Sequence, residues 1–130
     1  MLEAILLATL LNVSPVLVEK VYRAAGLDGV AVVWCESSFN PKACRREPNG
    51  TSWGLWQLYD LWHEQYRTDQ EKHIESGAVF LQLCKDKAKG DFVKAVSIYN
   101  SGSPTRSRPW GSRVVGLRDS LAHYLWLRLR

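Results

Sequence analysis

The 130-residue sequence lacks the features that would assign it to several specialised classes of protein. It has only three cysteines, and an odd number cannot form a complete disulfide framework. Their spacing matches no zinc-binding pattern, so we expect no metal and no cofactor. The chain has no internal repeat, no low-complexity run and no block of lysine and arginine long enough to follow a phosphate backbone. These absences argue against a disulfide scaffold, a zinc domain and a repeat protein.

Two interpretations of the cysteines stay open. The preferred one is that Cys35, Cys44 and Cys84 are reduced and partly buried thiols. The alternative is one disulfide with a thiol left over, for which Cys44 with Cys84 is only a guess.

The composition that is present describes one globular domain. Hydrophobic residues make up 46% of the chain and charged residues 23%, which is typical of a folded protein. A chain of this length buries a single core without disulfide or metal support, so we expect residues 1–130 to form one domain. The net charge of +4 suits an anionic partner: bacterial cell wall, nucleic acid or a membrane surface.

The apolar segment Met1–Leu11 predicts a buried helix. It carries Glu3, has no basic start and no small-residue cleavage site, and is too short to cross a bilayer. Apolar residues recur nearly all round the segment, which favours a core helix over a targeting signal. We therefore expect no membrane insertion.

Start and stop signals predict further helices along the chain. Ser14 and Pro15 provide an N-cap and a proline at the first helical position, where its missing N–H is harmless. The predicted helices run from Pro15 to Gly26, from about Asp28 to Glu36, from a capping box at Thr68–Glu71 to Gly90, from Asp91 through Tyr99, and from Gly111 to Arg130.

The remaining segments complete a mainly α prediction. Lys42–Trp53 contains turn-forming residues that predict a loop or a small β-hairpin with its turn at Pro48–Gly50. Gly54–Trp62 returns to a helical pattern, and Ser101–Trp110 is a loop. The sequence thus predicts about six to eight helices with one small β element.

One carboxylate stands in a context that suggests general-acid chemistry. Glu36 ends the apolar run Val30–Cys35 and is followed by a segment rich in Trp, Gln and Gly. Burial against apolar neighbours disfavours an ionised carboxylate and raises its pKa, so the proton is still present near neutral pH. An exposed glutamate at a helix end is the alternative on this context alone.

Three blocks of sequence resemble the lytic transglycosylase (SLT) domain of the lysozyme-like superfamily. They are Glu36–Pro41 (ESSFNP), Gly54–Leu58 (GLWQL) and Ala95–Gly102 (AVSIYNSG), which resemble that family's E-S-x-F-N-P, G-L-M-Q and A-x-x-Y-N-x-G blocks in the same order. The resemblance implies a lysozyme-like fold with a hairpin beside a cleft. It also implies cleavage of the bond between N-acetylmuramic acid and N-acetylglucosamine in peptidoglycan.

By that resemblance, Glu36 acts alone as acid and then as base. It protonates the leaving oxygen and then deprotonates the muramic 6-hydroxyl, which closes a 1,6-anhydro ring. The residues that the resemblance and the local chemistry assign to substrate binding are Ser37, Trp53, Gly54, Trp56, Gln57, Tyr59, Tyr99 and Asn100. Tyr99 is expected to orient the acid and to form the cleft floor, whereas Ser37 supports the helix end.

The sequence departs from the family pattern in places. Trp56 stands where the family commonly has Met, which predicts a reshaped subsite. Arg45–Glu47 lengthens the segment after Glu36, and its arginines could meet carboxylates of the wall or be solvated. Glu47 and Asp60 are the nearest candidates for a second carboxylate, and each is interpreted as a solvated charge. Of the other tryptophans, Trp34, Trp62 and Trp126 are predicted to be core, and Trp110 is left open.

Two other functions stay possible on this fold. They are a muramidase-type hydrolase and a non-catalytic wall-binding or virion module; a nucleic-acid binder rests on charge alone. A wall enzyme acts in the cell wall or periplasm, yet no secretion signal is visible in the sequence. The expected origins are a phage virion, a holin-released lysin or a domain cut from a longer secreted chain, and we expect a monomer.

Overall fold

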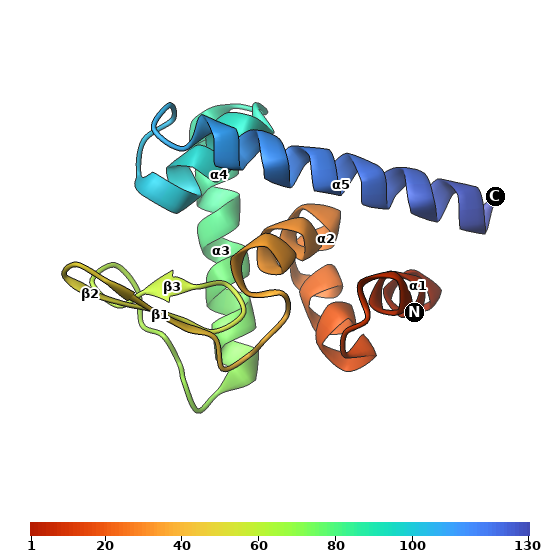
Figure 1. The fold of residues 1–130 in the computed structure, drawn as a ribbon, viewed down its shortest axis with the longest axis horizontal. Coiled ribbons are helices and arrows are strands. Elements are labelled where there is room, and N and C mark those ends of the chain that lie inside the picture. The colour runs from red at the N-terminus through yellow and green to blue at the C-terminus, as the bar shows by residue number, and fades with distance from the viewer.

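The computed structural model describes residues 1–130 as five helices and one small antiparallel sheet (Figure 1). This is the mainly helical architecture with a small β element that the sequence predicts. The elements are α1 (Leu2–Leu11), α2 (Pro15–Ser37), β1 (Cys44–Glu47), β2 (Gly50–Trp53), β3 (Leu58–Tyr59), α3 (Gln70–Ala88), α4 (Phe92–Ser101) and α5 (Arg108–Leu129).

Helix α1 has the predicted bounds but is buried on one side only. Ala4, Leu7 and Ala8 are in the core, whereas Leu2 and Ile5 are more than half exposed. The prediction of a buried core helix therefore holds for one face only, because apolar residues all round a segment do not say how many neighbours cover it. No helix of the chain combines the length and the hydropathy that crossing a membrane requires.

Helix α2 joins two predicted helices into one bent element. Ser14 accepts a hydrogen bond from the backbone N–H of Leu17 and so caps the helix, as predicted. Gly26 has φ 65° and ψ −161°, a backbone conformation that glycine adopts readily, and the chain turns there and continues as helix. Because these two parts form one element and Gly54–Trp62 is not helical, the structure has five helices and not the predicted six to eight.

The sheet lies between α2 and α3 in the sequence and has the strand order β1-β2-β3. The hairpin of β1 and β2 confirms the prediction, with Glu47 opposite Gly50 and a two-residue connection between them. The predicted helix over Gly54–Trp62 is wrong. Gly54 (φ 81°) and Gln57 (φ 51°) both adopt left-handed backbone conformations, which turn the chain back into β3.

The last three helices follow the predicted order with shifted ends. Asp69, one residue after the predicted Thr68, caps α3 by accepting a hydrogen bond from the N–H of Lys72. Asp91 caps α4 as predicted. Helix α5 begins at Arg108, so the preceding loop is shorter than the predicted one.

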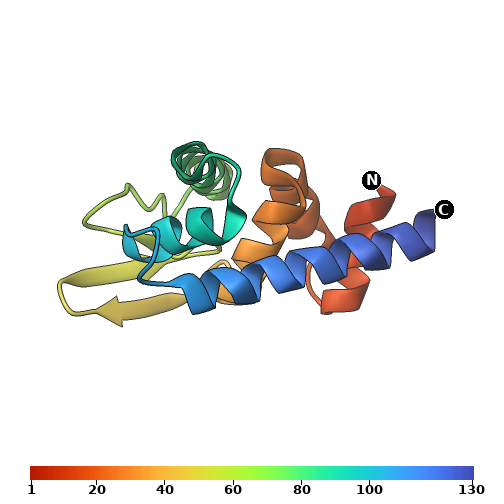
Figure 2. The same ribbon diagram turned by 90° about the horizontal axis from the view of Figure 1, so that it is seen from above.

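The arrangement leaves the sheet and the two termini at opposite ends of the molecule (Figures 1 and 2). Helix α2 lies centrally and packs against α1, α3 and α5, and α4 packs against both α3 and α5. One hydrophobic core of 24 buried residues joins all five helices to the turn between β2 and β3. The site described next lies where the sheet, α2 and α4 meet.

Candidate active site

Glu36 occupies the last turn of α2, at the edge of the core. The helix ends because Ser38 and then Phe39 take left-handed conformations, with φ 53° and 60°. Phe39 is buried, which fixes the direction in which the chain leaves the helix. The side chain of Glu36 is only 3% exposed, so a carboxyl group stands in a nearly dry position.

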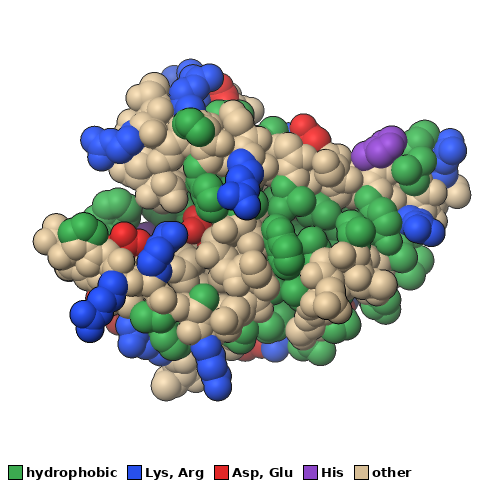
Figure 3. Space-filling view, in the orientation of Figure 1, with side chains coloured by type: hydrophobic (Ala, Val, Ile, Leu, Met, Phe, Trp, Pro, Cys, Tyr) green, Lys and Arg blue, Asp and Glu red, His purple; other side chains and the backbone are tan.

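A cleft of about 490 Å³ opens beside this carboxyl group. In Figure 3 it is the hollow between the sheet and the α4 end of the molecule, with acidic and basic side chains inside it. Its lining comes from α2, the sheet and the residues after it, α3 and α4: Glu36, Arg45, Glu47, Pro48, Ser52, Gln57, Leu58, Tyr59, Trp62, His63, Phe80, Tyr99 and Asn100.

The surroundings of Glu36 favour its protonated form. Burial raises the pKa of the carboxyl group from 4.5 to about 7, and the negative charge of Glu47 adds to the effect. The Arg45 guanidinium and the indole N–H of Trp110 act in the opposite direction. The Trp110 nitrogen is buried and has no hydrogen bond of normal geometry, so it opposes the shift only in part.

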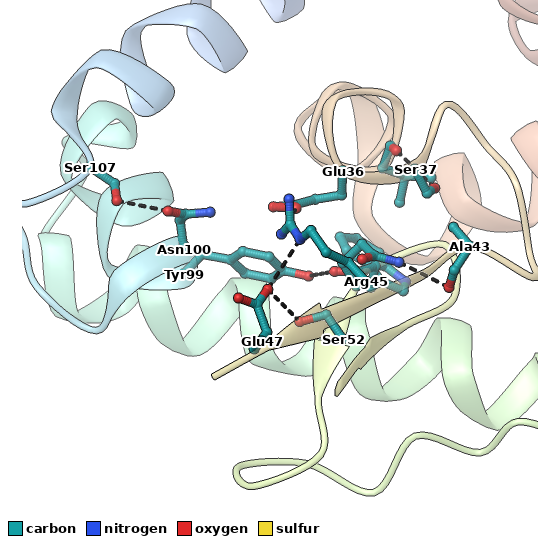
Figure 4. A network of polar contacts seen from close by, with 12 residues as sticks. Glu36, Ser37, Ala43, Arg45, Glu47, Ser52, Tyr99, Asn100 and Ser107 are labelled. Atoms are coloured by element: carbon teal, nitrogen blue, oxygen red, sulfur yellow. Dashed lines mark hydrogen bonds and ion pairs between the residues drawn. The ribbon is translucent and has the colours of Figure 1, made fainter. Parts of the chain in front are cut away.

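Arg45 links two carboxylates across the cleft (Figure 4). Its Nη2 lies 3.9 Å from Oε1 of Glu36, and its Nε donates a hydrogen bond of 3.1 Å to Oε1 of Glu47. The hydroxyl of Ser52 also donates to Glu47, at 3.3 Å. The interpretation of Glu47 as a solvated charge is wrong, because this side chain lines the cleft and is only 30% exposed.

Asp60, the other candidate for a second carboxylate, lies outside the cleft and bonds to the backbone of β2. Its Oδ1 accepts a hydrogen bond from the backbone N–H of Thr51. The residue is exposed and does not line the cleft.

Tyr99 and Asn100 lie on α4 on the opposite wall from the sheet. The Tyr99 ring lines the cleft, while its hydroxyl donates a hydrogen bond of 2.5 Å to the backbone carbonyl of Trp56. The hydroxyl therefore holds a backbone turn and does not bond to Glu36. Burial raises the pKa of Tyr99 well above its usual value, and the negative charge of Glu36 adds to the effect. The amide oxygen of Asn100 accepts a hydrogen bond from Ser107.

The Gly-Leu-Trp-Gln turn (Gly54–Gln57) is held by side chains from three helices. Ser37 of α2 donates to the carbonyl of Leu55 at 2.8 Å, in line with its predicted role at the helix end. His73 of α3 donates from Nδ1 to the Gln65 carbonyl and accepts the backbone N–H of Trp56 at Nε2.

Two predicted substrate-binding residues are enclosed within this turn. The Trp56 side chain is fully buried against Gly77, where an added Cβ would lie 2.1 Å from the indole. Gly54 packs against the His73 imidazole, which leaves 2.6 Å for a Cβ. Neither residue lines the cleft, so the expectation that Trp56 reshapes a subsite and that Gly54 approaches a sugar does not fit this placement.

Gln57 reaches the cleft from the end of the same turn. Its amide nitrogen donates to the carbonyls of Ala43 and Gly54, at 3.1 and 3.0 Å. These bonds fix the side chain in one orientation, and both are donated by the amide N–H groups. The amide oxygen makes no hydrogen bond within the protein and is available to a ligand.

The division of the aromatic residues between the cleft and the core differs from the prediction. Tyr59 lines the cleft with Trp62, and the two rings meet edge to face at 5.3 Å. Trp62 was predicted to be core, as was Trp126, yet each is more than half exposed. Trp53 lies on the other face of β2 from Ser52, where Arg67 stacks on it at 4.5 Å.

Trp34 and Trp110 are partly buried and pack against the core, which confirms the prediction for Trp34. Sequence reasoning missed His63 and Phe80, which line the cleft and whose rings meet edge to face at 4.2 Å. Neither lies in a block that resembles the family, and His63 follows directly after the predicted helical segment that ends at Trp62. All three cysteines are free thiols.

Taken together, a mainly helical fold, a cleft walled by a small sheet and a buried carboxyl group with a raised pKa define a protein of the lysozyme-like class. The profile of the Transglycosylase SLT domain matches residues 29–115, and the chain belongs to that family. Members of this family act on the peptidoglycan of the bacterial cell wall. No curated protein and no solved structure matches the chain.

Proposed function

We propose that the protein is a peptidoglycan lytic transglycosylase in which Glu36 is both the acid and the base. The observation that carries the proposal is the state of this one carboxyl group. It is 3% exposed, has a pKa of about 7 and faces a cleft of about 490 Å³. A group that keeps its proton near neutral pH is suited to protonating a glycosidic oxygen.

The reaction begins with transfer of the Glu36 proton to the oxygen between N-acetylmuramic acid and N-acetylglucosamine. As the bond breaks, positive charge develops at the anomeric carbon. Glu36, now ionised, takes the proton of the muramic 6-hydroxyl, whose oxygen attacks the anomeric carbon of its own sugar. The nucleophile is part of the substrate, so no separate water has to be bound.

Four further residues are proposed to hold the glycan. Tyr59 and Tyr99 present ring surfaces to the apolar faces of the sugars. Gln57 offers an amide oxygen to an N–H or hydroxyl group, and Asn100 lies on the opposite wall. Ser37 and Trp56 support this arrangement from behind through the Gly-Leu-Trp-Gln turn. Action at the cell wall follows from this substrate, and a phage origin stays a prediction.

The test is digestion of purified peptidoglycan by the wild type and by Glu36→Gln, followed by mass spectrometry. The wild type is expected to release muropeptides with 1,6-anhydro ends, which are one water lighter than hydrolysed ones. The Glu36→Gln protein should be folded and release none. Glu64→Gln, a matched change of an exposed glutamate outside the cleft, should retain full activity. Wall lysis by folded Glu36→Gln at the wild-type rate would refute the proposal.

A further inference from the structure

We propose that Glu47 is a second catalytic carboxylate and that it gives the cleft a hydrolytic activity beside the ring-closing one. The inference rests on the proposed role of Glu36 as the acid. It adds a different nucleophile, water, and a different product, a reducing muramic end.

The first argument is the position of Glu47 relative to Glu36. The two side chains come from β1 and α2 and meet the same cleft from different sides (Figure 4). One guanidinium contacts both, at 3.9 Å from Glu36 and 3.1 Å from Glu47. These contacts keep the carboxylates within about 9.5 Å of each other, the upper end of the separation at which paired carboxylates leave room for an attacking water.

The second argument is the space between the two carboxylates. The Arg45 guanidinium lies there, with an ion pair to Glu36 and a hydrogen bond to Glu47, so the gap accepts a small polar group that contacts both carboxylates. Arg45 is 56% exposed on a strand at the edge of the sheet, and its long side chain can swing out when a glycan enters. A water in its place would have Glu47 as a hydrogen-bond acceptor.

The third argument is that Glu47 is held in place without Arg45. The hydroxyl of Ser52 donates to the Oε1 atom of Glu47, and Ser52 is only 4% exposed. The two residues lie on paired strands, on either side of a two-residue connection, so the backbone fixes their separation. A carboxylate with a fixed partner is positioned to accept a proton at one place in the cleft.

The proposed step conserves atoms and protons. Glu36 gives its proton to the leaving oxygen as the bond from that oxygen to the anomeric carbon breaks. Water forms the new bond to the anomeric carbon and gives one proton to Glu47. The products are a free 4-hydroxyl and a reducing muramic end, and the proton on Glu47 returns to Glu36 through solvent.

Both activities need the same proton from Glu36, and they separate only in what attacks the anomeric carbon. A change that merely disturbs Glu36 or the fold therefore lowers both products together. Removing the base that takes a proton from the attacking water lowers only the amount of reducing muramic ends. The ratio of reducing to 1,6-anhydro ends thus reports the role of Glu47 independently of the overall rate.

The experiment uses peptidoglycan whose existing reducing ends have first been blocked by borohydride, so that every new reducing end comes from hydrolysis. The wild type, Glu47→Gln and the control Glu64→Gln digest this material, and mass spectrometry counts both kinds of end. Glu47→Gln is expected to lower the ratio of reducing to anhydro ends at least about tenfold, since a positioned base contributes 10²–10⁴-fold. Glu64→Gln is expected to leave the ratio unchanged.

Ser52→Ala serves as a second variant, because it removes a hydrogen bond from Glu47 and keeps the carboxylate. It should lower the ratio by a smaller factor. A wild type that makes anhydro ends alone, or a folded Glu47→Gln with the wild-type ratio, overturns the inference. A wild type that makes only reducing ends, lost in Glu47→Gln, supports the role of Glu47 while the ring-closing function fails.

Discussion

Replacing Glu36 by Gln should stabilise the protein at high pH and leave its stability unchanged at low pH. The amide has nearly the shape of a protonated carboxyl group and does not titrate. Glu36 is 3% exposed and its pKa is raised from 4.5 to about 7, so the folded protein resists ionising it. A carboxyl group buried in this way lowers the stability of the fold at the pH where it would ionise.

The sign follows from the protons bound by each state. Between pH 4.5 and 7 the folded chain keeps a proton on Glu36 that the unfolded chain releases. The favourable contribution of protonated Glu36 is complete below about pH 4.5 and is lost as the pH rises through 7. The whole change is about 3 kcal/mol, at 1.36 kcal/mol for each pH unit between the two pKa values.

The assay is thermal unfolding of the wild type and Glu36→Gln at pH 4 and pH 8.5. The two proteins should melt together at pH 4, and Glu36→Gln should melt roughly 10 °C higher at pH 8.5. Glu64→Gln is the control, because Glu64 is exposed and lies outside the cleft, so this variant should show no such divergence. Equal melting temperatures of the wild type and Glu36→Gln at both pH values would refute the claim that burial keeps Glu36 protonated.

Three further predictions concern the surroundings of Glu36. Arg45→Gln removes the cation that lowers the pKa of Glu36. In initial rates measured from pH 5 to 9, the alkaline limb of the pH–activity profile should therefore move to higher pH by as much as about 1 pH unit. An alkaline limb at the wild-type pH would contradict this. Tyr99→Phe leaves the Trp56 carbonyl without its donor and should lower the free energy of unfolding by about 1–3 kcal/mol in urea titrations. Gly77→Ala puts a methyl group 2.1 Å from the Trp56 ring and should cost about 1–3 kcal/mol. Combining it with Trp56→Met should recover part of that loss, and strictly additive costs would show that the two sites do not touch.

The helices were predictable because their ends carry local chemistry. Ser14, Asp91 and the glycine at position 26 act on their own backbone neighbourhood, and the structure shows the cap or bend at each. The failure at Gly54–Trp62 has the opposite cause. Apolar spacing there fits a helix, but Gln57 adopts a positive φ, and its side chain makes two hydrogen bonds across the turn that stabilise this conformation. One of these bonds joins Gln57 to Ala43, 14 residues away, and such a bond leaves no periodic pattern in the sequence.

The site residues that lie in the sequence blocks resembling the family could be predicted. A residue that strand pairing brings into the cleft could not. Glu36 and Tyr99 both lie in the cleft, as their blocks suggest. Glu47 has no local feature that separates it from a solvated charge. Only the pairing of β1 with β2 sets it beside Ser52 and across from Glu36.

The buried Gly-Leu-Trp-Gln turn explains how the cleft keeps its shape. Ser37, His73 and Tyr99 come from α2, α3 and α4, and each bonds to the backbone of Leu55 or Trp56. These bonds fix where α2 ends relative to α4, and therefore the distance from Glu36 to the wall that carries Tyr99. A bulky Trp56 fits in this position because Gly77 leaves space for its ring. The turn shapes the cleft through the placement of Glu36 and Gln57, while its own aromatic side chain, Trp56, faces the core.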